Sequence, residues 1–174
     1  SAVIIEDKIG LKQNSLFKDQ SKTKLDTING FSKKIKTAVK NRISNDFLII
    51  ARLESLIVGN SIADAINRAN NYSKAGADMI LIHSKRNSPN EIFKFAQKFK
   101  KSKFFKPLVA VPSAYPSVKE SQLIKNGFKL VIYANHLLRS SYLSMLETAK
   151  NILRNKRAKE SEKKMISIKK IIEL

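Results

Sequence analysis

The chain has 174 residues, of which 43% are hydrophobic, and it carries a formal net charge of +20. This length suits about one domain, and the apolar content is too high for a disordered chain. Because the sequence has no cysteine, disulfides, thiolate nucleophiles and zinc–thiolate sites are excluded. No apolar run approaches the roughly 18 to 20 residues of a membrane span, and no signal peptide is recognisable, so we expect a cytoplasmic protein without membrane association.

Five short apolar runs alternate with longer amphipathic segments along the chain. The runs are nearly continuous in apolar residues, which is typical of strands buried on both faces, and they occupy residues 3–5, 46–52, 78–83, 107–112 and 128–135. The segments between and after them resemble helices, most clearly 60–77, 88–100 and 136–154. This alternation predicts right-handed βα units and a parallel α/β sheet.

Residues that start or stop helices flank two of these segments. Ser61 is placed to cap the start of one helix, and Gly76 is placed to end it. Pro89 suits the first turn of the next helix, because its fixed φ is already helical.

The excess of positive charge comes mainly from lysines scattered over the predicted helices and their flanks. Direct base readout favours Arg, Asn and Gln, and binders of single strands interleave aromatic with basic side chains. Neither pattern is evident here. We therefore interpret the lysines as solvated helix faces and expect no nucleic-acid partner, and we keep a basic anion-binding module as the non-enzymatic alternative.

Polar side chains follow each predicted strand, at the edge of a parallel sheet that carries function in such folds. The candidates at these strand ends, all polar except the proline, are Glu6, Asp7, Arg52, Glu54, His83, Ser84, Lys85, Pro112, Ser113, Asn135 and His136. Cations, a carboxylate and an imidazole together suit a small anion beside a divalent metal. Each residue also has an ordinary structural interpretation: Arg52 can form a buried pair with Glu54, and His136 can begin the last helix.

Nucleotide binding has no motif to support it, because the sequence contains neither GxGxxG nor GxxxxGK[ST].

A ten-residue segment at 6–15 carries a resemblance to a known family. Its sequence, EDKIGLKQNS, fits the pattern EDK, five residues, then NS, and the chain thereby resembles the phosphoenolpyruvate mutases of the isocitrate lyase/phosphoenolpyruvate mutase superfamily. Further segments agree in order at 49–59, 64–85, 107–116, 130–141 and 166–174. The catalytic KKCGH loop of isocitrate lyases is absent.

The resemblance implies a TIM (β/α)8-type barrel with Mg²⁺ at its C-terminal mouth. The chain matches this barrel from the fourth strand, so we expect residues 1–155 to form strands four to eight, without the first three. Residues 156–174 would form a connector and a C-terminal helix that packs on a neighbouring subunit of a homodimer or homotetramer. On this interpretation the chain alone is an incomplete enzyme.

The resemblance also assigns roles to particular residues. Glu6 would bind Mg²⁺ through a water molecule. Lys12 and Asn14 would lie on a loop that closes over the substrate, with Asn14 facing the migrating group, and Ser15 would anchor that loop and help to bind substrate. Arg52 and His83 would contact the phosphoryl oxygens.

The implied activity is that of an isomerase in phosphonate biosynthesis. It would interconvert phosphoenolpyruvate and phosphonopyruvate by Mg²⁺-dependent phosphoryl transfer between oxygen and carbon. Phosphonopyruvate hydrolase and a superfamily carbon–carbon lyase are the enzymatic alternatives, and an inactive fragment is a further one.

Overall fold

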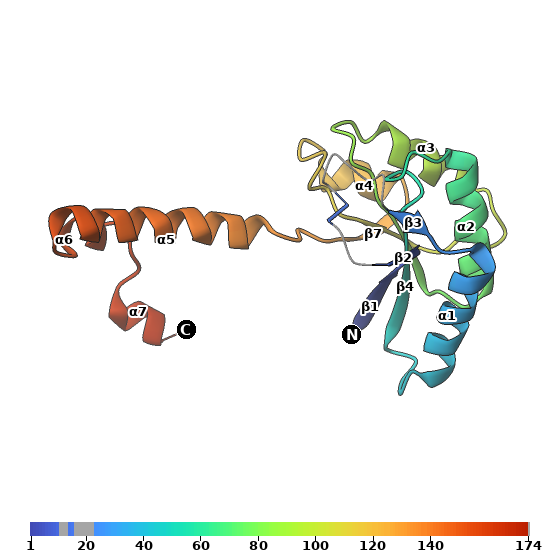
Figure 1. Cartoon of the computed structure of the whole chain (residues 1–174), viewed down its shortest axis with the longest axis horizontal. Helices are drawn as coiled ribbons and strands as arrows, with labels where there is room; N and C mark the ends of the chain where they lie inside the picture. The colour runs from blue at the N-terminus through green and yellow to red at the C-terminus, as the bar shows by residue number, and fades with distance from the viewer. Residues whose placement is uncertain (11–13, 16–22, 174) are drawn as a thin grey trace. The chain divides into compact units, whose positions relative to one another are not determined.

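The computed structural model describes residues 1–10, 14–15 and 23–173, and the chain divides into two compact units, 1–133 and 134–174. The first unit contains a parallel sheet with the strand order β1–β4–β5–β6–β7, which confirms the predicted α/β class (Figure 1). These strands are β1 (Ala2–Glu6), β4 (Leu48–Leu53), β5 (Met79–Ile82), β6 (Leu108–Ala110) and β7 (Phe128–Val131). A second, antiparallel sheet pairs β2 (Lys8–Ile9) with β3 (Lys24–Leu25).

Among the residues that the structure describes, four helices belong to the first unit and three to the second. The first four are α1 (Ile28–Asn41), α2 (Ile62–Lys74), α3 (Asn90–Phe99) and α4 (Glu120–Lys125). The second unit contains α5 (His136–Asn155), α6 (Lys159–Glu162) and α7 (Ile168–Ile172). None of the helices in the described part of the chain has the length and apolar character that a membrane crossing requires. The division at 155 that the sequence suggests stays a prediction.

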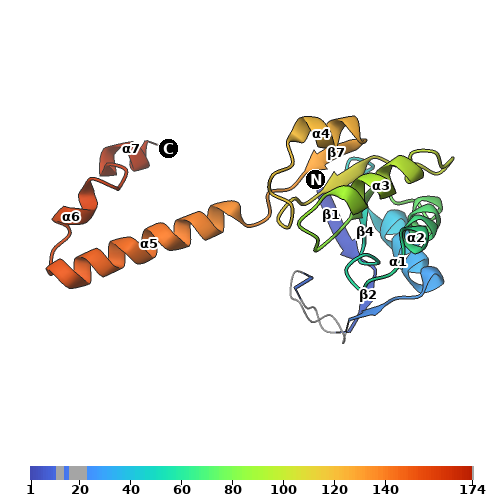
Figure 2. The ribbon, with the colours of Figure 1, turned by 90° about the horizontal axis from the view of Figure 1, so that it is seen from above.

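The three central strands, β4, β5 and β6, are largely buried on both faces, which explains why they are nearly continuous apolar runs, whereas the edge strands β1 and β7 are partly exposed. Helices α1 to α4 pack against one face (Figure 2). On that face, side chains such as Phe31, Ile80 and Phe95 form the larger core cluster. The strand residues next in sequence to those of the larger cluster point to the other face. There Ile50, Met79, Leu81 and Val109 form a smaller cluster. Because successive side chains of a strand point to opposite faces, Arg52 shares the face of Ile50 rather than that of the helices.

The helix ends follow the local signals in the sequence. Ser61 caps α2 by accepting a hydrogen bond from the backbone N–H of Asp64 at 3.1 Å. Gly76 follows the end of α2 with a φ of +105°, a conformation that glycine adopts without strain. Pro89 lies one position earlier than expected, at the N-cap of α3 rather than in its first turn.

Gly76 gives a test of how tightly α1 packs beside the turn that follows α2. A Cβ added at this glycine would lie 3.2 Å from Cγ2 of Val39, and the positive φ would strain it further. We expect Gly76→Ala to lower the free energy of unfolding by about 1 to 3 kcal/mol. Urea denaturation of the full-length protein would measure the loss.

Gly127→Ala is the matched control for this change. Gly127 has a similar φ of +91°, but its added Cβ would meet only Cζ of Phe105, at an ordinary 3.6 Å. The control separates backbone strain from crowding. An equal loss in both variants would contradict the role assigned to Val39.

Candidate active site

Residues from three neighbouring strands converge at the carboxyl edge of the sheet. Glu6 ends β1, Arg52 is the fifth of the six residues of β4, and His83 directly follows β5. The strand register pairs Glu6 with Arg52 directly. Nη1 of Arg52 lies 3.3 Å from Oε1 of Glu6, and Nη2 of Arg52 lies 2.8 Å from Nδ1 of His83. The structure therefore brings together the three residues that the sequence placed at successive strand ends.

Glu54 and Ser15 complete the surroundings of the Arg52 guanidinium. Nε of Arg52 donates to Oε1 of Glu54 at 2.6 Å, and Nη2 donates to the hydroxyl of Ser15 at 2.9 Å. The same hydroxyl donates to Oε2 of Glu54 at 2.5 Å. Both sequence interpretations of Arg52 thus coexist: it pairs with the buried Glu54, and it also lies at the predicted site.

Lys8 brings a second cation into this cluster. Its ammonium nitrogen lies 3.0 Å from Oε2 of Glu6, 3.2 Å from the Ser15 hydroxyl and 3.5 Å from Oε2 of Glu54. Its side chain is only 8% exposed. Two cations and two carboxylates therefore alternate in space, so that each buried charge has opposite charges as neighbours.

The contact between Arg52 and His83 assigns the tautomer of the imidazole. A guanidinium has no acceptor, so Nδ1 of His83 must carry a lone pair to accept the hydrogen bond at 2.8 Å. Oε1 of Glu54 also lies near Nδ1, but at the longer distance of 3.5 Å. The shorter contact decides the assignment, which puts the ring proton on Nε2. His83 can then donate to an anion from Nε2 while Arg52 fixes its orientation.

The electrostatic surroundings keep Glu54 ionised although its side chain is fully buried. Burial would raise the pKa of this carboxyl, but the Arg52 charge and the hydrogen bond from the Ser15 hydroxyl outweigh burial and lower the pKa below its ordinary value. In the tautomer assigned above, Arg52 and Ser15 provide the hydrogen bonds. Glu54 is therefore a permanent anion that orients Arg52.

Asp7, Arg68 and Tyr72 form a buried polar group next to this cluster. Oδ1 of Asp7 accepts a hydrogen bond from the backbone N–H of Glu54 at 2.8 Å, and Oδ2 lies 3.2 Å from Nη1 of Arg68 and 2.9 Å from the Tyr72 hydroxyl. Burial raises the pKa of Asp7 and that of Tyr72. Arg68 was not recognised from the sequence, because an arginine on an amphipathic helix looks like a surface residue.

The remaining predicted residues lie in different places. Asn14 is exposed, close in sequence to Ser15, whereas Lys12 lies outside the described residues. Asn135 and His136 begin α5 in the second unit, which agrees with their structural interpretation. Among the described residues, no group of three His, Asp or Glu side chains is arranged to bind a metal.

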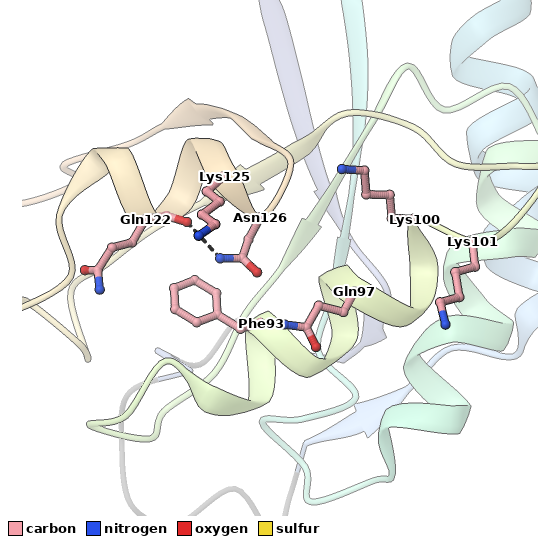
Figure 3. A pocket seen from close by; sticks show the side chains of 7 residues that line it. All are labelled: Phe93, Gln97, Lys100, Lys101, Gln122, Lys125 and Asn126. Carbon is pink, nitrogen blue, oxygen red and sulfur yellow. Dashed lines mark hydrogen bonds between the residues drawn. The ribbon is translucent and has the colours of Figure 1, made fainter.

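A hollow of about 770 Å³ lies between α3 and α4 (Figure 3). It is lined by Phe93, Gln97, Lys100, Lys101, Gln122, Lys125 and Asn126. The three lysines lie at the carboxyl ends of the two helices, where cations complement unpaired carbonyl groups. These helix ends lead into the starts of β6 and β7, at the opposite edge of the sheet from Arg52, so the hollow is separate from the candidate site.

The parallel α/β sheet and the charged cluster at its carboxyl edge are typical of barrel-type enzymes that act on small anions. The family model described as phosphoenolpyruvate phosphomutase matches residues 1–153. The chain therefore belongs to the phosphoenolpyruvate phosphomutase family.

Relatives named for two different activities have similar sequence identity to this chain. The chain is 36% identical to a phosphoenolpyruvate phosphomutase of Tetrahymena pyriformis and 38% identical to a phosphonopyruvate hydrolase of a Variovorax species, over its full length in both cases. It covers 57% of the first relative and 59% of the second. The chain thus spans a little over half the length of these relatives.

Solved structures show the same fold. A crystal structure of a phosphoenolpyruvate phosphomutase from Streptomyces platensis subsp. rosaceus matches 99% of this chain with a TM-score of 0.92 and 33% identity, and the match covers 58% of that structure. A phosphonopyruvate hydrolase in complex with oxalate and Mg²⁺ matches 99% of the chain with a TM-score of 0.86 and 35% identity, over 57% of its own length. The predicted TIM-barrel class is thereby confirmed.

The lowered pKa of Glu54 predicts how stability depends on pH. This carboxyl contributes stability above its ordinary pKa of 4.5, and the contribution is lost as the pH falls from there toward its lowered pKa in the folded state. We expect Glu54→Gln to lower the free energy of unfolding at pH 7. The difference in this free energy between the variant and the wild type should become smaller between pH 4.5 and pH 2.

Urea unfolding from pH 7 to pH 2 would measure this gap in the full-length protein. The raised pKa of Asp7 acts in the opposite direction, but it is present in both proteins and largely cancels in the difference. Glu162→Gln, which alters an exposed carboxylate in α6, is the control and should show no such pH-dependent gap. A gap that stays constant for Glu54→Gln would contradict the assignment.

Proposed function

We propose that the full-length protein interconverts phosphoenolpyruvate and phosphonopyruvate. The proposal is supported chiefly by the Arg52 guanidinium, which is oriented by Glu54 and Ser15 and lies beside both Glu6 and His83 at the carboxyl edge of the sheet. Membership of the phosphoenolpyruvate phosphomutase family supports the same reaction class.

In this reaction a phosphorus–oxygen bond breaks while a phosphorus–carbon bond forms, and no net proton is gained or lost. The transferred group passes through a loose, metaphosphate-like state, so positioning and charge neutralisation matter more than a protein nucleophile. Arg52 would bind the phosphoryl oxygens through its planar array of N–H donors, and His83 would donate from Nε2. Glu54 would keep Arg52 oriented throughout, because it stays ionised.

Glu6 is compatible with an outer position around Mg²⁺. Its carboxylate already faces two cations, Arg52 and Lys8, and can accept a hydrogen bond from metal-bound water. When bound, Mg²⁺ would neutralise charge on the enolate oxygen of pyruvate. Since the described residues include no complete ligand set, direct ligands would have to come from elsewhere.

Phosphonopyruvate hydrolysis is the second candidate, because the chain is 38% identical to a hydrolase of that name. The two reactions differ in whether water or the enolate oxygen of pyruvate accepts the phosphoryl group. Asn14 and the EDK–NS pattern favour the mutase, since the resemblance places this amide beside the migrating group. Lys12 is proposed to belong to the same loop as Asn14, which closes over the substrate.

Assembly into a homodimer or homotetramer remains part of the proposal. It is supported by the exposed apolar side chains of α5, which include Leu137, Leu138, Leu143 and Leu153. Apolar side chains gathered on one exposed helix are typical of interfaces.

Replacement of Arg52 tests the site directly. Arg52→Lys keeps the charge but loses the planar donor array, so we expect kcat/KM for phosphonopyruvate to fall by about a hundredfold or more. Arg86→Lys is the matched control, because Arg86 lies just beyond β5 and pairs with Glu91 while its side chain is 72% exposed. It should retain nearly full activity. Comparable losses in both variants would argue against the proposed site.

Asn14→Ala separates the two candidate reactions. The product formed from phosphonopyruvate can be followed by ³¹P NMR, in which phosphoenolpyruvate and free phosphate give distinct signals. We expect the wild type to form phosphoenolpyruvate and the variant to lose this activity, because the amide no longer guides the migrating group. Free phosphate as the sole wild-type product would show that hydrolysis is the reaction.

A further inference from the structure

Arg68 connects three segments next to the candidate site, although it lies on helix α2. Its Nη1 atom donates to Oδ2 of Asp7 at 3.2 Å and to the backbone carbonyl of Asp26 at 3.0 Å. It also contacts the hydroxyl of Tyr72, one helical turn along α2, at 2.9 Å. Nε of Arg68 is held by Asp64 at 3.1 Å, which fixes the guanidinium on the helix.

Asp7 is the residue through which these contacts reach the site. Its backbone N–H donates to the carbonyl of Arg52 at 3.0 Å, and its carboxylate accepts the N–H of Glu54 at 2.8 Å. Its own carbonyl accepts the N–H of Asp26 at 2.9 Å. Asp7 thus joins the end of β1 to the end of β4 and to the residue that follows β3.

The residues that flank segment 8–25, Asp7 and Asp26, meet at this point. Asp7 directly precedes β2 and Asp26 directly follows β3, and Arg68 binds both. Lys8, the first residue of β2, and Ser15 then reach Glu54 from the same segment. A displacement of Asp7 would therefore displace Glu54 and, through the Glu54 carboxylate, Arg52.

We propose that Arg68 and Tyr72 are positioning residues for Arg52, acting through Asp7 and Glu54. The helix α2 anchors the Asp7 carboxylate, Asp7 fixes the backbone of Glu54, and the Glu54 side chain aims the guanidinium. Neither Arg68 nor Tyr72 is proposed to touch the substrate. The inference rests on the proposed function only insofar as Arg52 acts on a phosphoryl group.

The chain contains a matched control at the other end of β4. Asp78 accepts the backbone N–H of Ile49 at 2.8 Å and pairs with Nη1 of Arg42 at 2.8 Å. Asp7 has the same arrangement, because its carboxylate also accepts a backbone N–H, that of Glu54, and pairs with an arginine, Arg68. The Asp78–Arg42 pair lies at the amino edge of the sheet, away from Arg52. It therefore stabilises β4 but does not orient the Arg52 side chain.

A double-mutant cycle distinguishes positioning from general stabilisation. Arg68→Lys loses the Nε–H that Asp64 holds, so the remaining cation is no longer fixed on the helix beside Asp7, and we expect the change to lower kcat/KM about tenfold when Arg52 is present. In an Arg52→Lys background its further effect should be less than about threefold, because the group that it positions is gone. Arg42→Lys should change kcat/KM by less than about threefold in both backgrounds.

Tyr72→Phe is a second, gentler variant in the same cycle. It removes the hydroxyl that donates to Asp7 but keeps the ring that packs edge-on against Phe31, with centroids 4.6 Å apart. It should show the same coupling to Arg52→Lys with a smaller single effect. If Arg68→Lys and Tyr72→Phe each lower kcat/KM by the same factor in both backgrounds, their role is merely structural and the inference is overturned.

A second readout keeps this test independent of the proposed reaction. The ¹H–¹⁵N resonance of the Arg52 Nε–H group reports its hydrogen bond to Glu54 without any turnover. If the wild type does not convert phosphonopyruvate, the proposed function fails, and this resonance then decides the inference. It should shift in Arg68→Lys and Tyr72→Phe and stay in place in Arg42→Lys. An unmoved resonance in Arg68→Lys would overturn the inference.

Discussion

The candidate site depends on one electrostatic constraint, which is that opposite charges must be buried together. The Glu54 side chain is fully buried, whereas those of Lys8, Arg52 and Glu6 are 8%, 18% and 18% exposed. A buried charge without a partner is far more costly than a buried pair, so removal of one of these charges destabilises the protein by leaving its partners unpaired. This interdependence explains why the Lys8 ammonium and the Ser15 hydroxyl both contact the Glu54 carboxylate.

The same constraint bears on which ligands the proposed site accepts. With His83 neutral in the tautomer assigned above, the charges of Glu6, Lys8, Arg52 and Glu54 sum to zero. A phosphonate or phosphate that enters such a cluster adds negative charge that these residues do not balance. A divalent cation entering with the anion would restore the balance, which is the electrostatic reason that Mg²⁺ fits the proposed reaction.

Much of this arrangement follows from sequence, and the reasons are specific. The central strands are predictable because burial on both faces makes them apolar throughout, and the meeting of Glu6, Arg52 and His83 follows from parallel strands ending at one edge. Helix α4 was missed because six residues are too few to display helical periodicity. The role of Arg68 was hidden because its partner Asp7 is 61 residues away, and only the folded chain brings them together.

The strand that carries Arg52 is held in the same way at both ends. At its amino end, Asp78 binds the N–H of Ile49 and the guanidinium of Arg42; just beyond its carboxyl end, Asp7 binds the N–H of Glu54 and Arg68. An aspartate that accepts from backbone and arginine together fixes the axial position of a strand more firmly than the slanted ladder bonds of a parallel sheet alone. Since β4 lies between β1 and β5, fixing its carboxyl end also sets the distances from Arg52 to Glu6 on one side and to His83 on the other. Of the two ion pairs, only that of Asp7 with Arg68 lies next to Glu54 and bears on the geometry of the site, whereas that of Asp78 with Arg42 holds the amino end of the strand.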